Sequence, residues 1–173
     1  MKASLIEISW LRDHIHYDPD LGEFRSKGGT FYFDGSVRRL PKAGVTLNQT
    51  RTGAGYLEVR FSVVRELAHR LAWALHHGEW PASVIDHIDG NPSNNRISNL
   101  RDVSQSVNAQ NIKGPKGRSR SGLLGAHSYL GDRFRSSIVV GGVKVYLGTF
   151  LTEIEAHEAY LEARRKHHPG NTL

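Results

Sequence analysis

The chain has 173 residues and a formal net charge of +6, and its hydrophobic share of 38% lies below that of a typical compact globule. It contains no cysteine, which excludes disulfides and cysteine-bound zinc, and no run of about 18 apolar residues that would span a membrane. Because the first residues reach Glu7 without a long apolar run, we expect no secretory signal and a cytoplasmic protein.

The positive charge is concentrated in the last third of the chain. Residues 1–112 carry 13 Lys and Arg against 12 Asp and Glu, whereas residues 113–173 carry 10 against 5. A concentrated positive field attracts phosphate polyanions and releases their counterions. On charge alone, a nucleic-acid-binding protein and a soluble protein with a basic surface are equally good interpretations.

The first third predicts a short helix followed by β-hairpins. Apolar residues recur at helical spacing over 4–16. Short apolar stretches follow at 30–33 and 44–47, and residues 56–61 alternate with the period of a half-buried strand. We therefore interpret residues 20–64 as β-hairpins.

The clearest helix covers residues 66–77. Leu67, Leu71 and Leu75 lie on one face at four-residue steps. Gly78 is a good helix terminator, so the helix is expected to end at His77.

A strand, a long loop, a second strand and a short helix are expected next. The strand covers 84–88, and the loop 89–98 is rich in Asn, Gly, Pro and Ser, which favour turns. Residues 100–103 suit a return strand, and Ser104 is a natural N-cap for a helix over 105–112.

Residues 113–122 read as a basic linker, because Gly and Pro discourage helix and strand there. It is either a solvated spacer or a segment that lies along a phosphate backbone. Two strands are then predicted at 133–140 and 143–150, joined by a Gly-Gly turn, with a capping-box helix from Glu153 to about His167.

An acid, an imidazole and several amides gather between Asp86 and Asn108. Neighbouring strand residues point to opposite faces, so Asp86 and His87 would need a bent strand end, which Gly90 makes feasible. A carboxylate and an amide oxygen form a sparse, oxygen-only site that suits Mg²⁺. Asn99 is better suited to hold the loop or to orient the imidazole. On these residues alone, an ordinary Asn-rich turn remains the alternative.

The segment from His69 to Asn111, with its Asp-His pair, its Asn-Asn-Arg-Ile-x-Asn-Leu run and its later Asn, resembles the HNH endonucleases of phages and mobile introns. The resemblance implies a His-Me finger (ββα-metal) fold, with Asp86 and Asn108 as metal ligands, His87 as general base and Asn99 as the middle Asn of the catalytic set. The third position is Asn rather than His, which favours Mg²⁺, with Mn²⁺ able to substitute, over Zn²⁺. The adjacent histidines 76–77 and 167–168 are interpreted as exposed or helix-end residues rather than ligands.

A second resemblance covers the C-terminal segment. The run Arg135 to Tyr160, with its Tyr-Leu-Gly-x-Phe and Glu-Ala-x-x-Ala-Tyr pieces, is similar to the Apetala/ethylene-response-factor DNA-binding domain. That family folds as a three-stranded sheet on one helix and reads DNA with the sheet. Phe134 stands near the place where many relatives have Trp.

The prediction is therefore an α+β protein with four parts: a β-rich DNA-contacting region (1–65), an HNH core (66–112), the linker (113–122) and a DNA-binding domain (123–173). We expect a monomeric, site-preferring, homing-type endonuclease acting on double-stranded DNA in a bacterial or phage-infected cell. A non-catalytic DNA-binding regulator is the main alternative, and an RNA-directed or non-specific nuclease is another. The expected DNA contacts are Arg70, Arg96, Lys113, Lys116, Arg118, Arg120, Arg133, Arg135 and Lys144.

Overall fold

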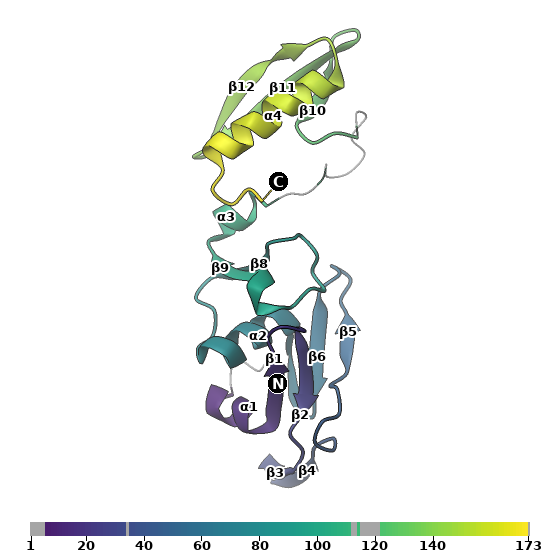
Figure 1. Ribbon diagram of the computed structural model, residues 1–173, viewed down its shortest axis with the longest axis vertical. Coiled ribbons are helices and arrows are strands. Elements are labelled where there is room, and N and C mark those ends of the chain that lie inside the picture. Colours follow the sequence, from purple (N-terminus) through teal and green to yellow (C-terminus); the bar gives the residue numbers. More distant parts are fainter. Residues whose placement is uncertain (1–5, 34, 112–113, 115–121, 173) are drawn as a thin grey trace. The chain divides into compact units, whose positions relative to one another are not determined.

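The computed structural model describes residues 6–33, 35–111, 114 and 122–172, which form short helices and small antiparallel sheets (Figure 1). The chain divides into two compact units, Met1–Val103 and Ser104–Leu173. The mixed helix and strand content confirms the expected α+β class, whereas the ββα-metal arrangement and the four domain ranges stay predictions. Among the described residues, no helix is both long and apolar enough to cross a membrane.

The first unit opens with helix α1 (Ile8–His14) and a hairpin of β1 (Ile15–Asp18) and β2 (Glu23–Ser26). The expected helix over 4–16 is therefore shorter at both ends within the described residues. Ile15 and Tyr17 are buried while His16 is exposed, and this alternation suits a strand paired with β2. Ile15 and His16, which helical spacing alone assigns to the helix, therefore belong to strand β1 because they pair with β2.

Two further sheets follow in the region expected to hold hairpins. Strands β3 (Thr30–Phe33) and β4 (Ser36–Arg39) form one, and β5 (Gln49–Arg51), β6 (Leu57–Phe61) and β7 (Val64–Leu67) form the other. The apolar stretch at 44–47, expected within the hairpin region, forms no strand and contributes only an isolated bridge between Arg25 and Thr46. Gly44 has φ of 83°, which takes the chain out of the extended conformation.

Helix α2 (Ala68–His77) begins two residues later than expected, because Glu66 and Leu67 pair with β6 as the end of β7. It ends as predicted at Gly78, which adopts φ of 85° and donates its N–H to the Ala74 carbonyl. The buried face of α2 joins one apolar core with β1, β2, β6 and the β8–β9 hairpin. The buried core residues are Leu11, Ile15, Tyr17, Phe24, Phe31, Leu40, Leu47, Val59, Phe61, Val64, Ala68, Leu71, Ala72, Leu75, Ile85 and Leu100.

The predicted strand–loop–strand unit is present. Strands β8 (Val84–His87) and β9 (Leu100–Val103) pair antiparallel, and the loop between them ends in a 3-10 turn, η2 (Ile97–Asn99). Ile85 and Leu100 anchor the hairpin in the core. This hairpin carries two of the predicted site residues.

The second unit begins with α3 (Gln105–Asn108), which Ser104 caps by accepting from the Val107 N–H. The expected helix over 105–112 is therefore too long. The chain leaves α3 in turns, and the Gln110 carbonyl accepts a hydrogen bond from Arg164 of the same unit.

A three-stranded sheet with one helix completes the second unit. Strands β10 (Ala126–Tyr129), β11 (Arg133–Val140) and β12 (Val143–Phe150) lie in that order, and α4 (Glu153–His167) covers one face (Figure 1). Both predicted strands and the capping box at Thr152 and Glu155 are confirmed. Ile154, in the first turn of α4, is 59% exposed and does not join the packing on the sheet.

Gly22, in the turn between β1 and β2, should resist substitution. It has φ of 72°, and a Cβ there would lie 2.7 Å from the Arg96 nitrogen and from the Asn95 carbonyl carbon. Gly44 has a similar φ of 83° but no atom within 4 Å of such a Cβ. Both Ala variants place an alanine in the left-handed backbone region, which is strained. Only Gly22→Ala also forces a Cβ against neighbouring backbone atoms.

We expect Gly22→Ala to lower the free energy of unfolding by about 2 kcal/mol more than Gly44→Ala. Denaturant titration of both variants measures this difference. Equal losses would contradict the close packing of the turn against the β8–β9 loop.

Candidate active site

The candidate site lies at the end of the β8–β9 hairpin, where β8 places Asp86 and His87 next to each other. In the register of the hairpin, Asp86 stands opposite Arg101 and His87 opposite Leu100. Both polar side chains are buried, with 5% of each exposed. The Gly90 N–H donates to the His87 carbonyl at 2.8 Å, so the chain turns directly after the strand. Two buried polar groups on one short strand need dedicated partners.

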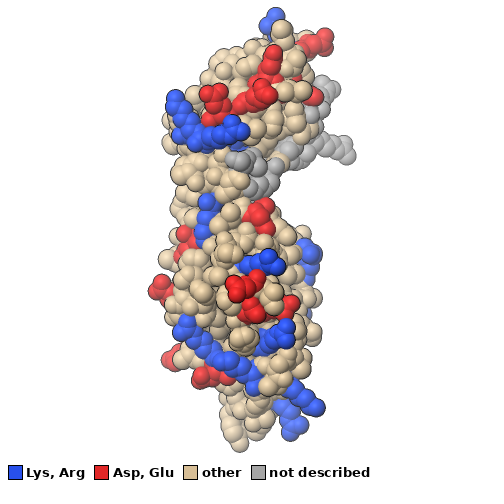
Figure 2. All heavy atoms as spheres, viewed as in Figure 1, with Lys and Arg blue, Asp and Glu red and all other residues tan. Residues whose placement is uncertain are grey.

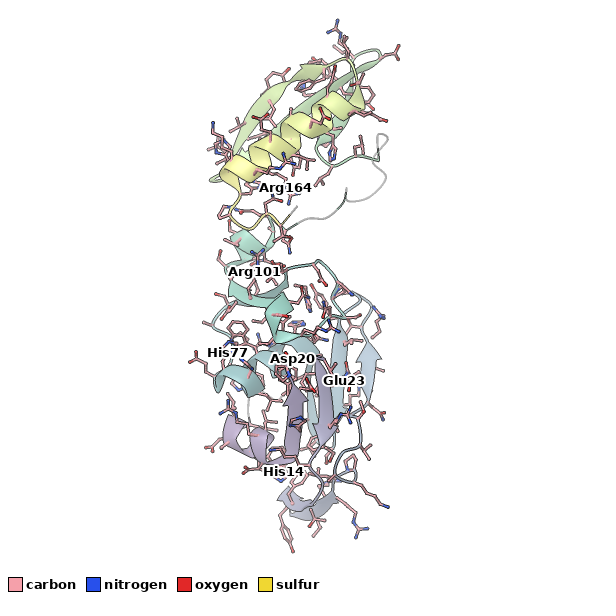
Figure 3. All side chains as sticks on the ribbon, viewed as in Figure 1. His14, Asp20, Glu23, His77, Arg101 and Arg164 are labelled. Carbon is pink, nitrogen blue, oxygen red and sulfur yellow. The ribbon has the colours of Figure 1, made fainter. Side chains whose placement is uncertain are left out.

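Arg101, labelled in Figure 3, lies on β9. It forms an ion pair with Asp86. Its Nε and Nη2 donate to Oδ2 of Asp86 at 2.9 and 2.7 Å. The pair joins directly opposite residues of two short strands, so it also links β8 to β9. A buried carboxylate is costly unless it is paired, and Arg101 supplies that compensation.

Asn95 in the loop is a hydrogen-bond partner of His87. Its side-chain oxygen lies 3.3 Å from Nε2 of His87, and its amide nitrogen donates to the Ser93 carbonyl at 3.4 Å. An amide oxygen only accepts, so in this arrangement Nε2 of His87 carries the ring proton. The nitrogen with the basic lone pair is then Nδ1. Asn95 was not predicted as a site residue, because nothing in an Asn-rich loop distinguishes it from Asn91 or Asn94.

Two aromatic rings pack against the His87 imidazole. The His69 ring from α2 lies edge-on at 5.1 Å between centroids, and Tyr56 lies 5.9 Å away. Burial lowers the pKa of His87, although its bond to Asn95 and the charges of Asp89 and Asp86 act in the opposite direction. The imidazole is therefore neutral at neutral pH and able to accept a proton.

His69 is a second buried neutral imidazole. Only 6% of it is exposed, and its Nδ1 has no hydrogen-bond partner among the described residues. Burial, the neighbouring His87 and Arg70 lower the pKa of His69 to about 3.

Asn99 holds the loop rather than the imidazole. Its side-chain oxygen accepts from the Asp89 N–H at 2.9 Å, and its amide nitrogen donates to Oδ1 of Asp89 and to the Asn94 carbonyl, both at 2.9 Å. Asn94 donates to the other oxygen of Asp89 at 2.7 Å. Of the two roles considered for Asn99, the described contacts correspond to loop support.

The other predicted residues lie in several places. Asn108 ends α3 in the second unit, and its assignment as a ligand stays a prediction. Arg96 is exposed, and Arg70 lies 3.5 Å from Glu66 in an ion pair along α2. Four predicted DNA contacts, Lys113, Lys116, Arg118 and Arg120, lie outside the described residues.

Arg133, Arg135 and Lys144 share one face of the second-unit sheet. Alternation puts Arg133, Arg135 and Val139 on the same side of β11, and Lys144 pairs directly with Val139. That face is opposite to α4, because the intervening Ser136 and Ile138 are buried. The Arg135 guanidinium lies 3.7 Å from the ring centroid of Tyr129.

Figure 2 shows basic and acidic side chains interspersed over the visible face of the first unit, in agreement with its nearly balanced charge. In the second unit, α4 has an acidic first turn and a basic last turn. Among the described residues, no group of three or more His, Asp or Glu side chains is arranged so that it could hold a metal ion.

Comparisons with known proteins place the hairpin in a family context. Residues 66–110 match the family model described as HNH endonuclease, so this segment, from the end of β7 to just past α3, is an HNH endonuclease domain. Protein 3.8 of Escherichia phage T7 is 43% identical over 58 residues, which cover 33% of this chain and 47% of that protein. The chain thus spans about half the length of this curated relative. No solved structure matches the chain significantly.

The Asp86–Arg101 pair should matter for stability. Replacing Arg101 with Met leaves the buried carboxylate without its arginine, and the free energy of unfolding should fall by about 2–3 kcal/mol. Adding Asp86→Asn to this variant should restore part of the loss, because the uncompensated charge disappears.

A matched control is Arg25→Met, which breaks the exposed pair with Glu23. Denaturant unfolding should place the loss for that control below about 1 kcal/mol. If Arg25→Met and Arg101→Met cost the same, the buried pair has no special role in the hairpin.

The buried imidazole of His69 should make stability depend on pH. Its pKa is about 3 in the folded protein and near 6.5 in the unfolded chain, so between these values only the unfolded state binds the proton. The contribution of the neutral His69 to the free energy of unfolding is therefore complete above pH 6.5. It is lost as the pH falls below this value, by at most about 1.4 kcal/mol per pH unit.

His69→Phe keeps an aromatic ring and removes the titrating group. Its free energy of unfolding should therefore fall less steeply between pH 6 and 4 than that of the wild type, while the two curves run parallel above pH 7. The same slope in both proteins at low pH would show that His69 is not buried as a neutral group.

Proposed function

We propose that the protein is a metal-dependent, site-preferring DNA endonuclease of the homing type that hydrolyses a phosphodiester bond. The observation that carries this proposal is a buried, neutral His87 beside the Asp86 carboxylate, within the segment that matches the HNH endonuclease model. An imidazole able to take a proton from water and an acid able to hold a cation are two groups that metal-assisted phosphodiester hydrolysis can use.

His87 acts as the general base. Its Nε2 donates to Asn95, so Nδ1 is the nitrogen that accepts the proton from the attacking water. Burial favours the neutral ring over the imidazolium, which keeps this base unprotonated at neutral pH. Asn99 contributes by holding the loop that carries Asn95.

Asp86 and Asn108 are proposed as the ligands of Mg²⁺, with Mn²⁺ able to substitute. Their donor set, a carboxylate and an amide oxygen, fits a hard cation that retains water and takes phosphate oxygens as further ligands. Arg101 already engages Oδ2 of Asp86, so a cation would share this carboxylate with the guanidinium or displace it. A cation held there would stabilise negative charge on the leaving 3′ oxygen.

Double-stranded DNA is the proposed substrate, and the second unit would supply many of the contacts to its phosphate backbone. Arg133, Arg135 and Lys144 lie on one open sheet face, where Arg135 is stacked on Tyr129. Cationic side chains on a shared face can follow a phosphate backbone. We further propose a monomer, whose single site would nick one strand.

Cleavage of supercoiled plasmid and of a random-site DNA library tests the proposal. Wild type should cleave with Mg²⁺ or Mn²⁺ and not with EDTA, and His87→Ala should lower the rate at least about 100-fold while leaving DNA affinity unchanged. His77→Ala, on the exposed end of α2, is the matched control and should cleave normally.

Equal cleavage by wild type and His87→Ala would refute the general base. Salt-sensitive binding to DNA without any metal-dependent cleavage of the library would instead support the DNA-binding regulator. A comparison of duplex DNA with RNA distinguishes the RNA-directed alternative.

The open sheet face predicts a specific effect on binding. Arg135→Ala should weaken DNA binding and reduce the slope of log affinity against log salt by about 1. Arg165→Ala, an exposed change on α4, serves as the control and should alter neither quantity as much. Titration by fluorescence anisotropy at several salt concentrations measures both, and equal effects of the two variants would argue against this face.

A further inference from the structure

The β1–β2 hairpin contacts the candidate active site at the backbone of Asn95. The Tyr17 hydroxyl donates to the Asn95 carbonyl at 2.7 Å, and both residues are buried. Burial raises the pKa of Tyr17, so the hydroxyl stays protonated and able to donate. This hydrogen bond from a buried tyrosine hydroxyl ties the loop to strand β1.

Two more contacts hold the same point of the loop. The Ile97 N–H donates to the Pro19 carbonyl at 3.0 Å. Gly22 packs so closely on the peptide between Asn95 and Arg96 that a Cβ at this position would lie 2.7 Å from its atoms. Residues flanking Asn95 are therefore clamped from one side by the β1–β2 turn.

The side chain of Asn95 connects this clamp to the imidazole. Only 2% of Asn95 is exposed, its oxygen lies 3.3 Å from Nε2 of His87, and its amide nitrogen points to the Ser93 carbonyl. A buried amide with both ends engaged has one favourable orientation, with the oxygen toward the ring. It therefore selects which ring nitrogen of His87 carries the proton.

We propose that Asn95 is the positioning residue for His87 and that the β1–β2 hairpin, through Tyr17 on β1 and Gly22 in the turn, holds Asn95 in place. The role of the middle Asn is thereby divided: Asn99 supports the loop, and Asn95 orients the base. The N-terminal hairpin, expected only to contact DNA, becomes part of the catalytic scaffold. The catalytic consequence rests on the proposed nuclease function, whereas the positioning of the ring does not.

The direct test is the tautomeric state of His87 in the full-length, metal-free protein, read from long-range proton–nitrogen NMR at about pH 8, where free imidazole is unprotonated. Wild type should show a single tautomer with the proton on Nε2. Asn95→Leu is close in size but offers no acceptor, and should give averaged nitrogen shifts. Asn95→Asp restores an acceptor and should return the single tautomer.

A second pair of variants keeps the test valid if Asn95→Leu does not fold. Tyr17→Phe removes one hydroxyl at a distance from the ring and should shift the His87 nitrogens in the same direction, by a smaller amount. Tyr32→Phe is the matched control, because Tyr32 is 82% exposed on β3, and it should leave the shifts unchanged. Wild-type shifts that are already averaged, or that all variants leave unchanged, would overturn the inference.

Cleavage kinetics provide the second readout. Asn95→Leu should lower kcat by roughly 10- to 100-fold without changing KM, Asn95→Asp should retain most of the rate, and Tyr17→Phe should lose about threefold to tenfold. If the NMR result holds but no variant and no wild-type protein cleaves DNA, the nuclease proposal fails and the positioning contact stands. If cleavage depends on His87 but not on Asn95, the positioning inference alone is wrong.

Discussion

The structure of the first unit depends on the burial of a carboxylate and an imidazole at the end of one short strand. Asp86 and His87 are neighbours, so they need separate partners, and the β8–β9 hairpin supplies them from two directions. Arg101 crosses from β9 to the acid, and Asn95 approaches the ring from the loop. Without these partners, the buried carboxylate would be uncompensated and the buried imidazole would lose a hydrogen-bond partner. With them, the strand end keeps a carboxylate beside a neutral imidazole.

Several neighbouring elements contact His87 or the loop beside it. Helix α2 places the His69 ring against that of His87, and Tyr17 on β1 donates to the backbone of Asn95, whose side chain contacts the same His87 ring. Hydrogen bonds from Asn94 and Asn99 to the Asp89 carboxylate tie the two ends of that loop together. Chemistry of this kind requires groups held in place before the substrate arrives, and the many short hydrogen bonds of the loop serve that end.

Local patterns in the sequence predicted much of this architecture, including α2 with its glycine end, the β8–β9 hairpin and the capped α4. The errors arose where tertiary pairing overrides local preference: β2 converts the end of the expected first helix into β1, and bonds from Arg164 replace the end of α3. The Asp-His pair was found because its chemistry is rare, whereas Asn95 was missed because three loop asparagines look alike. Tertiary contacts distinguish it: its bond to His87 and the bond that its carbonyl accepts from Tyr17, 78 residues away.

The central claim, that a cation bound at Asp86 serves the base beside it, is most directly tested by paramagnetic broadening. Mn²⁺ would be titrated into the isotope-labelled, full-length protein bound to duplex DNA. The account predicts that signals of Asp86 and its neighbours broaden first, together with those of Asn108, and that Asp86→Ala abolishes this effect. Broadening centred on the exposed His76–His77 pair, or unaffected by Asp86→Ala, would contradict the account.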